Sequence, residues 1–355
     1  MLWHEGRWVK PHGATPTTHL IKTQIGKLPG GIDLSDSVEN EYYCLKLAAA
    51  FGLPVNNASI ETFGETKALV IERFDRRWTK DGRLLRLPQE DCCQALSVPP
   101  TLKYQNEGGP GMYDVLNLLK GSDTPIEDQD TFLKAQIIFW LMGATDAHAK
   151  NFSVFLGPGG SYRMTPLYDV VTAQAALDAR QIERKQMRMA MSVGTNRHYR
   201  FDQIHGRHFV QTAVRAGMSK KRATGIVEEI AARAPDALYT AANALPAAVP
   251  SATVETVSTA VMDRIRGLDC LVRRSAYGRG VALDRLGGRY RRARLFRFST
   301  EPFCQGACGS QNQLSVPMPD LSLRHSLHSK PRSKLIDFWA GWGRGSITSI
   351  SLRMK

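Results

Sequence analysis

The sequence predicts an α+β fold in which a small part containing β-strands is followed by a larger, mainly helical part. Short β-rich segments separated by glycine turns occupy much of the first 75 residues, and alanine-rich helical patterns dominate from there to about residue 270. With 355 residues, of which 43% are hydrophobic, the chain is long enough to bury a sizeable core. This ordinary composition argues against wholesale disorder.

The N-terminal part alternates strand and helix patterns. Residues 17–25 are short and β-rich and lead into a glycine turn, which is typical of a strand with its loop. A helix is expected to begin at Ser37, and Glu41 lies early in it, where the helix dipole favours an acidic side chain. Residues 60–63 and 68–74 are expected to form two further strands joined by a glycine turn.

After Asp75 the pattern turns helical. Residues 131–143 form an apolar, aromatic-rich run that predicts a buried core helix. Residues 151–156 and 161–165 are two short strands joined by the sequence Gly-Pro-Gly-Gly, which predicts a hairpin. Four amphipathic helices are expected beyond it, at residues 209–216, 221–234, 235–244 and 254–270.

The positive charge of the chain lies almost wholly at its C-terminal end. The net charge is +14, yet residues 273–355 alone hold 16 basic and 4 acidic side chains. From about residue 277, Arg-rich, Ser-rich and Gly-rich pieces alternate without periodicity, so residues 279–355 are expected to form a basic, poorly ordered tail. A protein that binds nucleic acid through this tail is therefore one alternative function.

The cysteines and the apolar segments indicate a cytoplasmic location. The six cysteines contain no pair of CxxC motifs that would hold zinc, and free thiols in a reducing compartment are expected. The first residues offer no apolar core of a signal peptide, and no apolar run approaches the roughly 20 residues of a membrane span. No membrane partner is expected.

The sharpest chemical signal is a set of three polar residues around the predicted hairpin. Asp146 precedes Asn151 by five positions at the end of the core helix, and Asp169 follows the hairpin. Protein kinases use this order, with a carboxylate that accepts a hydroxyl proton and a carboxylate and an amide that hold magnesium. Taken alone, such a pair is common, and Asp and Asn are frequent loop residues that bond to the backbone.

Two upstream residues complete the kinase pattern. Lys22 lies on a predicted strand and Glu41 on the helix that follows, in the order in which kinases pair a strand lysine with a helical glutamate. Taken separately, Lys22 is better explained as a solvated edge-strand charge. Glu41 by itself is equally explained as a favourable charge near a helix start. The ordered set favours the kinase interpretation.

Several segments together resemble HipA-type serine/threonine protein kinases of toxin–antitoxin systems, and the likeness runs from about residue 2 to about residue 278. The segments that carry it are Thr-Thr-His-Leu-Ile-Lys at 17–22, Asn-Glu-Tyr-Tyr-Cys-Leu at 40–45, Val-Ile-Glu-Arg-Phe-Asp-Arg-Arg-Trp at 70–78, Arg-Leu-Pro-Gln-Glu-Asp at 86–91, Gly-Gly-Pro-Gly at 108–111, residues 146–155, and Tyr-Arg-Met-Thr-Pro-Leu-Tyr-Asp at 162–169.

The resemblance implies a bilobal, protein-kinase-like fold. It places a remnant of the small lobe at residues 1–75, the helical lobe with the catalytic loop at 76–278, and the tail at 279–355 outside the likeness. It implies ATP and Mg²⁺ as cofactors and transfer of the γ-phosphate to a hydroxyl of a translation component such as an aminoacyl-tRNA synthetase. A cognate DNA-binding antitoxin is the implied partner, with indirect contact to operator DNA through the arginine-bearing loop at 194–200.

The resemblance also implies a role for each site residue. Asp146 is the implied catalytic base, and Asn151 and Asp169 the implied magnesium ligands. Lys22 is expected to contact the ATP phosphates, and Glu41 to orient that lysine. The remaining residues of the implied cofactor-binding set are Glu72, Arg73 and Phe74 at the adenine hinge, His148 and Lys150 in the catalytic loop, and Tyr168 beside Asp169.

The ends of the chain depart from the family pattern. HipA kinases carry a small N-terminal subdomain and a glycine-bearing phosphate loop before the strand that contains Lys22, so the resemblance implies an N-terminally truncated chain. No other glycine-rich phosphate motif replaces that loop. An active kinase therefore stays open beside a catalytically impaired relic that retains antitoxin or nucleotide binding.

Overall fold

The computed structural model describes residues 1–276, and the calls on the tail at 279–355 lie outside the described residues. The first lobe holds an antiparallel sheet with strand order β3–β7–β6. Two smaller hairpins, β1–β2 and β4–β5, flank it. The strands are β1 (Leu2–His4), β2 (Arg7–Val9), β3 (His19–Thr23), β4 (Gly26–Lys27), β5 (Asp33–Leu34), β6 (Ala58–Phe63) and β7 (Thr66–Glu72).

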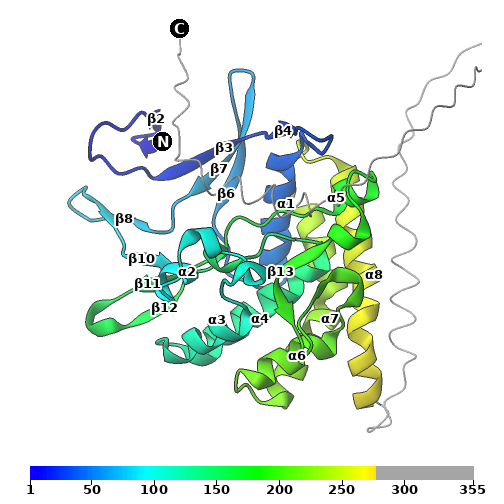
Figure 1. The fold of residues 1–355 in the computed structure, drawn as a ribbon. Coiled ribbons are helices and arrows are strands. Elements are labelled where there is room, and N and C mark those ends of the chain that lie inside the picture. The colour runs from blue at the N-terminus through cyan, green and yellow to red at the C-terminus, as the bar shows by residue number, and fades with distance from the viewer. Residues whose placement is uncertain (277–355) are drawn as a thin grey trace, which may run out of the picture.

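Helix α1 (Ser37–Ala50) joins the first lobe to the second (Figure 1). It packs against β6 and β7 on one side and against α7 (Lys220–Asn243) on the other. Tyr43 and Leu47 are fully buried in these contacts. Because α1 is held from both sides, its acidic residues have fixed positions relative to both lobes.

The second lobe begins with two β-units and continues as a helical bundle. Strand β10 adds to the hairpin β11–β12, while β8–β9 and β13–β14 form separate hairpins. The strands are β8 (Arg76–Trp78), β9 (Leu84–Arg86), β10 (Gln89–Asp91), β11 (Ser153–Leu156), β12 (Tyr162–Met164), β13 (Arg188–Val193) and β14 (His198–Arg200). The other helices are α2 (Cys92–Ala95), α3 (Met112–Leu118), α4 (Pro125–Met142), α5 (Gln174–Asp178), α6 (Gly206–Arg215) and α8 (Ser251–Ala276).

Helix α4 is the centre of the second lobe. It contacts α6, α7 and α8, and Phe132, Ile137 and Trp140 are buried along it. Residues 135–142, its C-terminal part, are all buried, and a helix segment buried on every side is stable only when other elements surround it. Gly143, at φ +81°, ends α4 in the left-handed conformation that favours glycine. The chain therefore leaves the core at a fixed point, three residues before Asp146.

The fold class and most of the expected elements are confirmed, with two corrections. Three short strands, β8 to β10, follow Asp75 where a helical pattern was expected. The two helices expected at 221–234 and 235–244 are one helix, α7, with Pro235 inside it. Proline removes one helical hydrogen bond, and here the packing of α7 against α1, α6 and α8 outweighs that loss. The hairpin β1–β2 was not foreseen.

Within residues 1–276, no helix combines the length and the apolar character needed to cross a membrane. Cys44, Cys92 and Cys93 are buried free thiols, and burial raises the pKa of Cys44 to about 12. These thiols are accordingly poor nucleophiles.

Candidate active site

Lys22 joins the two lobes through two carboxylates. It lies on β3, opposite Leu69 of β7, and its Nζ donates to Glu41 Oε1 at 2.8 Å and Oε2 at 2.9 Å. The same Nζ donates to Asp169 Oδ1 at 2.6 Å. Burial disfavours the ammonium, but the two carboxylates outweigh that effect and raise the pKa of Lys22. The predicted pair of Lys22 and Glu41 is present, and Asp169 is a second carboxylate bonded to the same lysine.

Asp146, Asn151 and Asp169 line one small pocket at the end of α4. Asn151 Nδ2 donates to the backbone carbonyl of Asp146 at 2.9 Å, which closes the predicted catalytic loop on itself. Asp169 has φ of +58°, an uncommon conformation for a residue with a side chain. The structure therefore brings together the three residues that the sequence order singled out.

Asp146 is largely enclosed and has one strong hydrogen-bond donor. Burial raises its pKa to about 7, while a bond from Tyr104 favours the ionised form. The Tyr104 hydroxyl donates to Asp146 Oδ1 at 2.6 Å. Tyr104 is 4% exposed, and burial raises its pKa, so the phenol keeps its proton and acts as a donor. No pattern in the sequence singled out Tyr104.

The Gly-Gly-Pro-Gly segment at 108–111 holds Tyr104 in place. The Gly109 N–H donates to the Tyr104 carbonyl at 2.9 Å. A Cβ on Gly109 would lie 2.0 Å from the Leu102 carbonyl oxygen and 2.8 Å from that of Tyr104. Only glycine fits there, so the motif allows the backbone to pass close to the carbonyls of Leu102 and Tyr104. Lys103, the residue before Tyr104, is also buried, and its Nζ lies 5.0 Å from the Tyr104 ring centroid.

The two other catalytic-loop residues are held by contacts within the protein. Lys150 Nζ donates to Asp91 Oδ2 at 2.7 Å. His148 is 4% exposed, and burial together with the positive charge of Lys103 lowers its pKa to about 3. Its Nε2 lies 3.7 Å from Asp146 Oδ2. His148 is therefore a neutral imidazole near the carboxylate.

The side chains of the expected adenine hinge differ in their surroundings. Glu72 is exposed and accepts a 3.0 Å hydrogen bond from Asn57. Arg73 makes a two-pronged ion pair with Asp75, through Nε at 2.9 Å and Nη2 at 2.7 Å. Of these three side chains, Phe74 is the one that lies next to the candidate site, because its ring packs against Tyr168.

Phe74 and Tyr168 form an aromatic contact next to the site. Their ring centroids are 5.7 Å apart, and Phe74 also packs edge-on against Phe155 at 5.5 Å. The Tyr168 hydroxyl donates to the Lys150 carbonyl at 2.9 Å and shares a 2.5 Å hydrogen bond with Ser153. Tyr168 thus ties the catalytic loop to the segment that carries Asp169.

A second tie fixes Asp169 relative to α1. Asn40 Nδ2 donates to the Thr172 carbonyl, and the Thr172 N–H donates to Asn40 Oδ1, both at 3.0 Å. Thr172 Oγ1 also donates to the Met142 carbonyl at 2.6 Å. Asn40 is the neighbour of Glu41, so one turn of α1 positions both the lysine and the segment after Asp169.

The donor set suits magnesium bound together with phosphate. Within the described residues no group of three His, Cys, Asp or Glu side chains is placed to hold a metal by itself. Mg²⁺ is commonly held by one or two carboxylates plus phosphate and water oxygens. Asp169 offers a carboxylate, held ionised because Lys22 lowers its pKa despite burial. Asn151 uses its amide nitrogen internally, which leaves its oxygen for a cation.

Comparison with known proteins finds relatives among kinases. A family model described as the HipA-like C-terminal domain matches residues 2–238. A Sinorhizobium fredii protein provisionally named kinase Y4mE is 38% identical over 191 residues, which is 54% of this chain. The serine/threonine-protein kinase toxin HipA of Shewanella oneidensis is 31% identical over 194 residues, or 51% of this chain. The chain spans 42% of the length of each of these curated relatives.

A solved structure has the same fold. The complex of Shewanella oneidensis MR-1 HipA with HipB and operator DNA matches with a TM-score of 0.64, over 79% of this chain and 65% of that chain. The identity is 22%, so this likeness concerns the fold. A lysine–glutamate pair in the sheet lobe, next to a helical lobe, is typical of a protein-kinase-like fold. The chain belongs to the HipA-like C-terminal domain family, which confirms the resemblance inferred from its motifs.

Proposed function

We propose that this chain is the catalytic portion of a serine/threonine protein kinase that transfers the γ-phosphate of ATP to a protein hydroxyl. The observation that carries the proposal is the convergence of Asp146, Asn151 and Asp169 on one pocket, with Lys22 bonded to Asp169. Family membership supports the same class of activity. The implied domain limits, at about residues 75 and 278, are part of this proposal.

Each residue has a role that its surroundings support. Asp146, with a pKa near 7 and a donor on Oδ1, would accept the hydroxyl proton through its other oxygen. Asn151 and Asp169 would hold Mg²⁺, which neutralises phosphate charge when bound. Lys22, oriented by Glu41, would exchange its bond with Asp169 for a phosphate oxygen. Phe74 would supply an apolar wall for adenine at the hinge formed with Glu72 and Arg73.

Two catalytic-loop residues would act more locally. Lys150 is within reach of the loop backbone and would contact the transferred phosphate after leaving Asp91. His148, buried and neutral, would keep the space beside Asp146 dry and shaped. Tyr168 would hold both segments in register through its hydroxyl.

The partners are proposed from the family. The relative of known structure is assembled with HipB and operator DNA, and a cognate antitoxin is the corresponding proposal for this chain. The β13–β14 loop is the proposed point of approach to DNA. Arg200, at the end of β14, is already paired with Asp202 at 2.6 Å, which leaves Arg197 in the loop as the better placed arginine. A translation component such as an aminoacyl-tRNA synthetase is the proposed acceptor.

The test compares two aspartates. Asp146→Asn is expected to leave Mg²⁺–ATP binding within about twofold while lowering transfer at least about 100-fold, because it removes proton acceptance alone. Asp169→Asn is expected to weaken Mg²⁺-dependent ATP binding itself, and Lys22→Ala to weaken both. Calorimetric titration of ATP with and without Mg²⁺, beside transfer of labelled phosphate to purified aminoacyl-tRNA synthetases and casein, separates these outcomes.

Two results would reject the proposal in different ways. Wild-type protein that binds Mg²⁺–ATP but transfers nothing would support the alternative of an impaired relic with a binding function. Wild-type protein that binds no nucleotide would show that the site residues of this chain are insufficient for nucleotide binding.

A further inference from the structure

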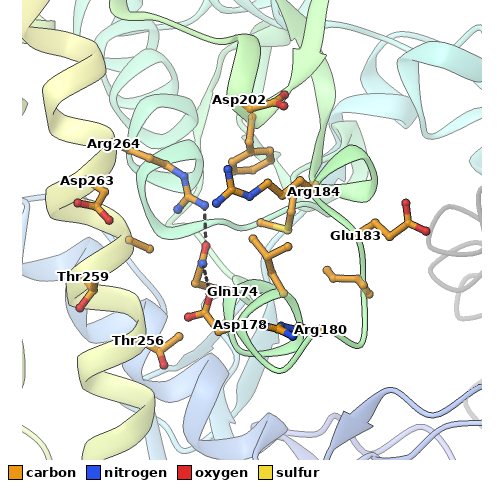
Figure 2. A pocket seen from close by; sticks show the side chains of 15 residues that line it. Gln174, Asp178, Arg180, Glu183, Arg184, Asp202, Thr256, Thr259, Asp263 and Arg264 are labelled. Carbon is orange, nitrogen blue, oxygen red and sulfur yellow. Dashed lines mark hydrogen bonds between the residues drawn. The ribbon is translucent and has the colours of Figure 1, made fainter.

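A second pocket lies away from the candidate active site, between α5, the 3-10 turn Arg184–Gln186 and α8 (Figure 2). Its volume of about 770 Å³ is within the range of sites for small organic ligands. Apolar side chains, among them Leu177, Met187 and Phe201, contribute to its walls. It contains none of the residues assigned above to phosphate transfer.

Three arginines line this pocket, and none of them makes an ion pair among the described residues. Arg264 Nη1 donates to the Leu141 carbonyl at 2.8 Å, and its Nη2 donates to Gln174 Oε1 at 2.6 Å. These neutral acceptors use two of its five N–H groups. Burial lowers the pKa of Arg264 to about 10, although the charges of Asp178 and Asp263 act in the opposite direction. Arg180 and Arg184 likewise make no ion pair within residues 1–276.

The acidic residues of the pocket are already engaged. Asp202 pairs with Arg200 at 2.6 Å and Glu183 with Lys185 at 2.7 Å, and neither cation lines the pocket. Of the other two carboxylates, Asp263 lies 3.5 Å from Arg266, and Asp178 accepts a 2.8 Å hydrogen bond from the neutral amide of Gln174. The lining holds three arginines and four carboxylates, and three of these carboxylates have a cation of their own outside the lining. The lining and these partners together therefore carry six positive and four negative charges.

The arrangement of the arginines suits an oxyanion. Figure 2 shows the guanidinium ends of Arg264 and Arg184 turned toward the middle of the pocket. The Arg264 guanidinium lies 5.2 Å from the centroid of the Phe201 ring, which restricts its plane. A planar guanidinium with unused N–H groups binds phosphate in a two-pronged manner. Several cations match a doubly charged phosphate better than a singly charged carboxylate.

We propose that this pocket binds a small organic phosphate, with the phosphate between Arg264 and Arg184 and the organic part against Phe201 and Met187. The mixed lining decides the class of ligand. The guanidinium groups provide for the charged end, and the apolar wall provides for a body about the size of one ring. Such a site is independent of the ATP site proposed above.

Phenyl phosphate is a suitable probe because it joins one ring to one phosphate and lacks adenine. Calorimetric titration of the full chain is expected to show one site for phenyl phosphate. Its affinity should exceed those of inorganic phosphate, which lacks the ring, and benzoate, which lacks the phosphate, at least tenfold. Equal affinity for inorganic phosphate would indicate a general anion site and would overturn the proposal, as would tighter binding of benzoate or no binding at all.

The location is tested with two exposed surface residues. Arg184→Gln is expected to weaken phenyl phosphate binding at least tenfold, since Arg184 lines the pocket and its side chain makes no hydrogen bond or ion pair within the described residues. Lys220→Gln removes the same charge from the first residue of α7, outside the pocket, and should leave the affinity within twofold. Equal effects of the two substitutions would place the ligand elsewhere. Arg264→Lys should also weaken binding, with thermal melting as the check on folding.

Discussion

Tyr104 donates a 2.6 Å hydrogen bond to Oδ1 of Asp146, a residue 42 positions further along the chain. The bond occupies one carboxylate oxygen and leaves the other for a substrate. It also stabilises the ionised carboxylate against the effect of burial. Tyr104 therefore acts as a positioning residue for the proposed base.

Tyr104→Phe is expected to lower the rate of phosphate transfer about tenfold at pH 7, in line with a lost hydrogen bond to a charged group. The pKa of Asp146 would rise without its donor, so the pH–rate profile should move to higher pH and the defect should shrink above pH 8. Tyr113→Phe, at an exposed tyrosine, is the control. If Tyr104→Phe leaves the pH–rate profile unshifted, the hydrogen bond does not influence the pKa of Asp146 and contributes to folding alone.

Glu41→Gln is expected to lower ATP affinity and transfer at least tenfold, because Lys22 would lose its two-pronged carboxylate partner and stay on Asp169. Glu39→Gln is a matched control. Glu39 is buried on the same helix and pairs with Lys67 rather than with the site lysine. Titration with Mg²⁺–ATP and a transfer assay measure both variants. Similar losses in the two would point to damage to α1 as a whole.

Gly109→Ala is expected to destabilise the protein by about 1–3 kcal/mol, because the new Cβ would meet backbone carbonyl oxygens rather than a movable side chain. Displacement of Tyr104 should also reduce transfer. In contrast, Gly225→Ala in α7 places its Cβ in open space and is expected to stabilise the helix by up to about 1 kcal/mol. Urea unfolding curves measure both. An unchanged midpoint of urea unfolding for Gly109→Ala would contradict the close contact of Gly109 with the carbonyl oxygens of Leu102 and Tyr104.

Stability is expected to fall as the pH drops from about 6.5 toward 4, in part through His208. Burial first, and then the nearby His198, lower its pKa to about 4. His208 stacks on His198 at 4.1 Å, and His205 lies 5.6 Å away. The unfolded chain binds a proton at His208 near pH 6.5 and the folded chain does not, so protons favour unfolding in this window.

The contribution of His208 is isolated by His208→Asn, which retains an acceptor for the His205 N–H. The free energy of unfolding of this variant should depend less steeply on pH between 6.5 and 4 than that of the wild type. Parallel curves for the two proteins would mean that other groups, such as buried carboxylates, account for the acid sensitivity.

Local sequence was sufficient to predict the structure of the loop at residues 146–151. Asp146 and Asn151 are five residues apart and bond within one turn, so their relation follows from spacing. The hairpin after them follows from glycine and proline at its turn, and α1 from its N-terminal residues and apolar pattern. The short strands β8 to β10 and the continuity of α7 through Pro235 were missed because packing against distant elements decides them.

The sequence alone determined the lobes, the order of the site residues and their chemical types, because these depend on periodicity, turns and side-chain chemistry. It did not determine which side chains pair across the fold. The contact of Lys22 with Asp169 spans 147 positions, and that of Lys150 with Asp91 spans 59. Only the tertiary structure decided these pairs. It also brought Tyr104 onto Asp146 and left Arg264 without an ion pair among the described residues. These contacts depend on α1, α4 and α8, which bring together segments that lie far apart in the chain, and no local sequence pattern encodes such contacts.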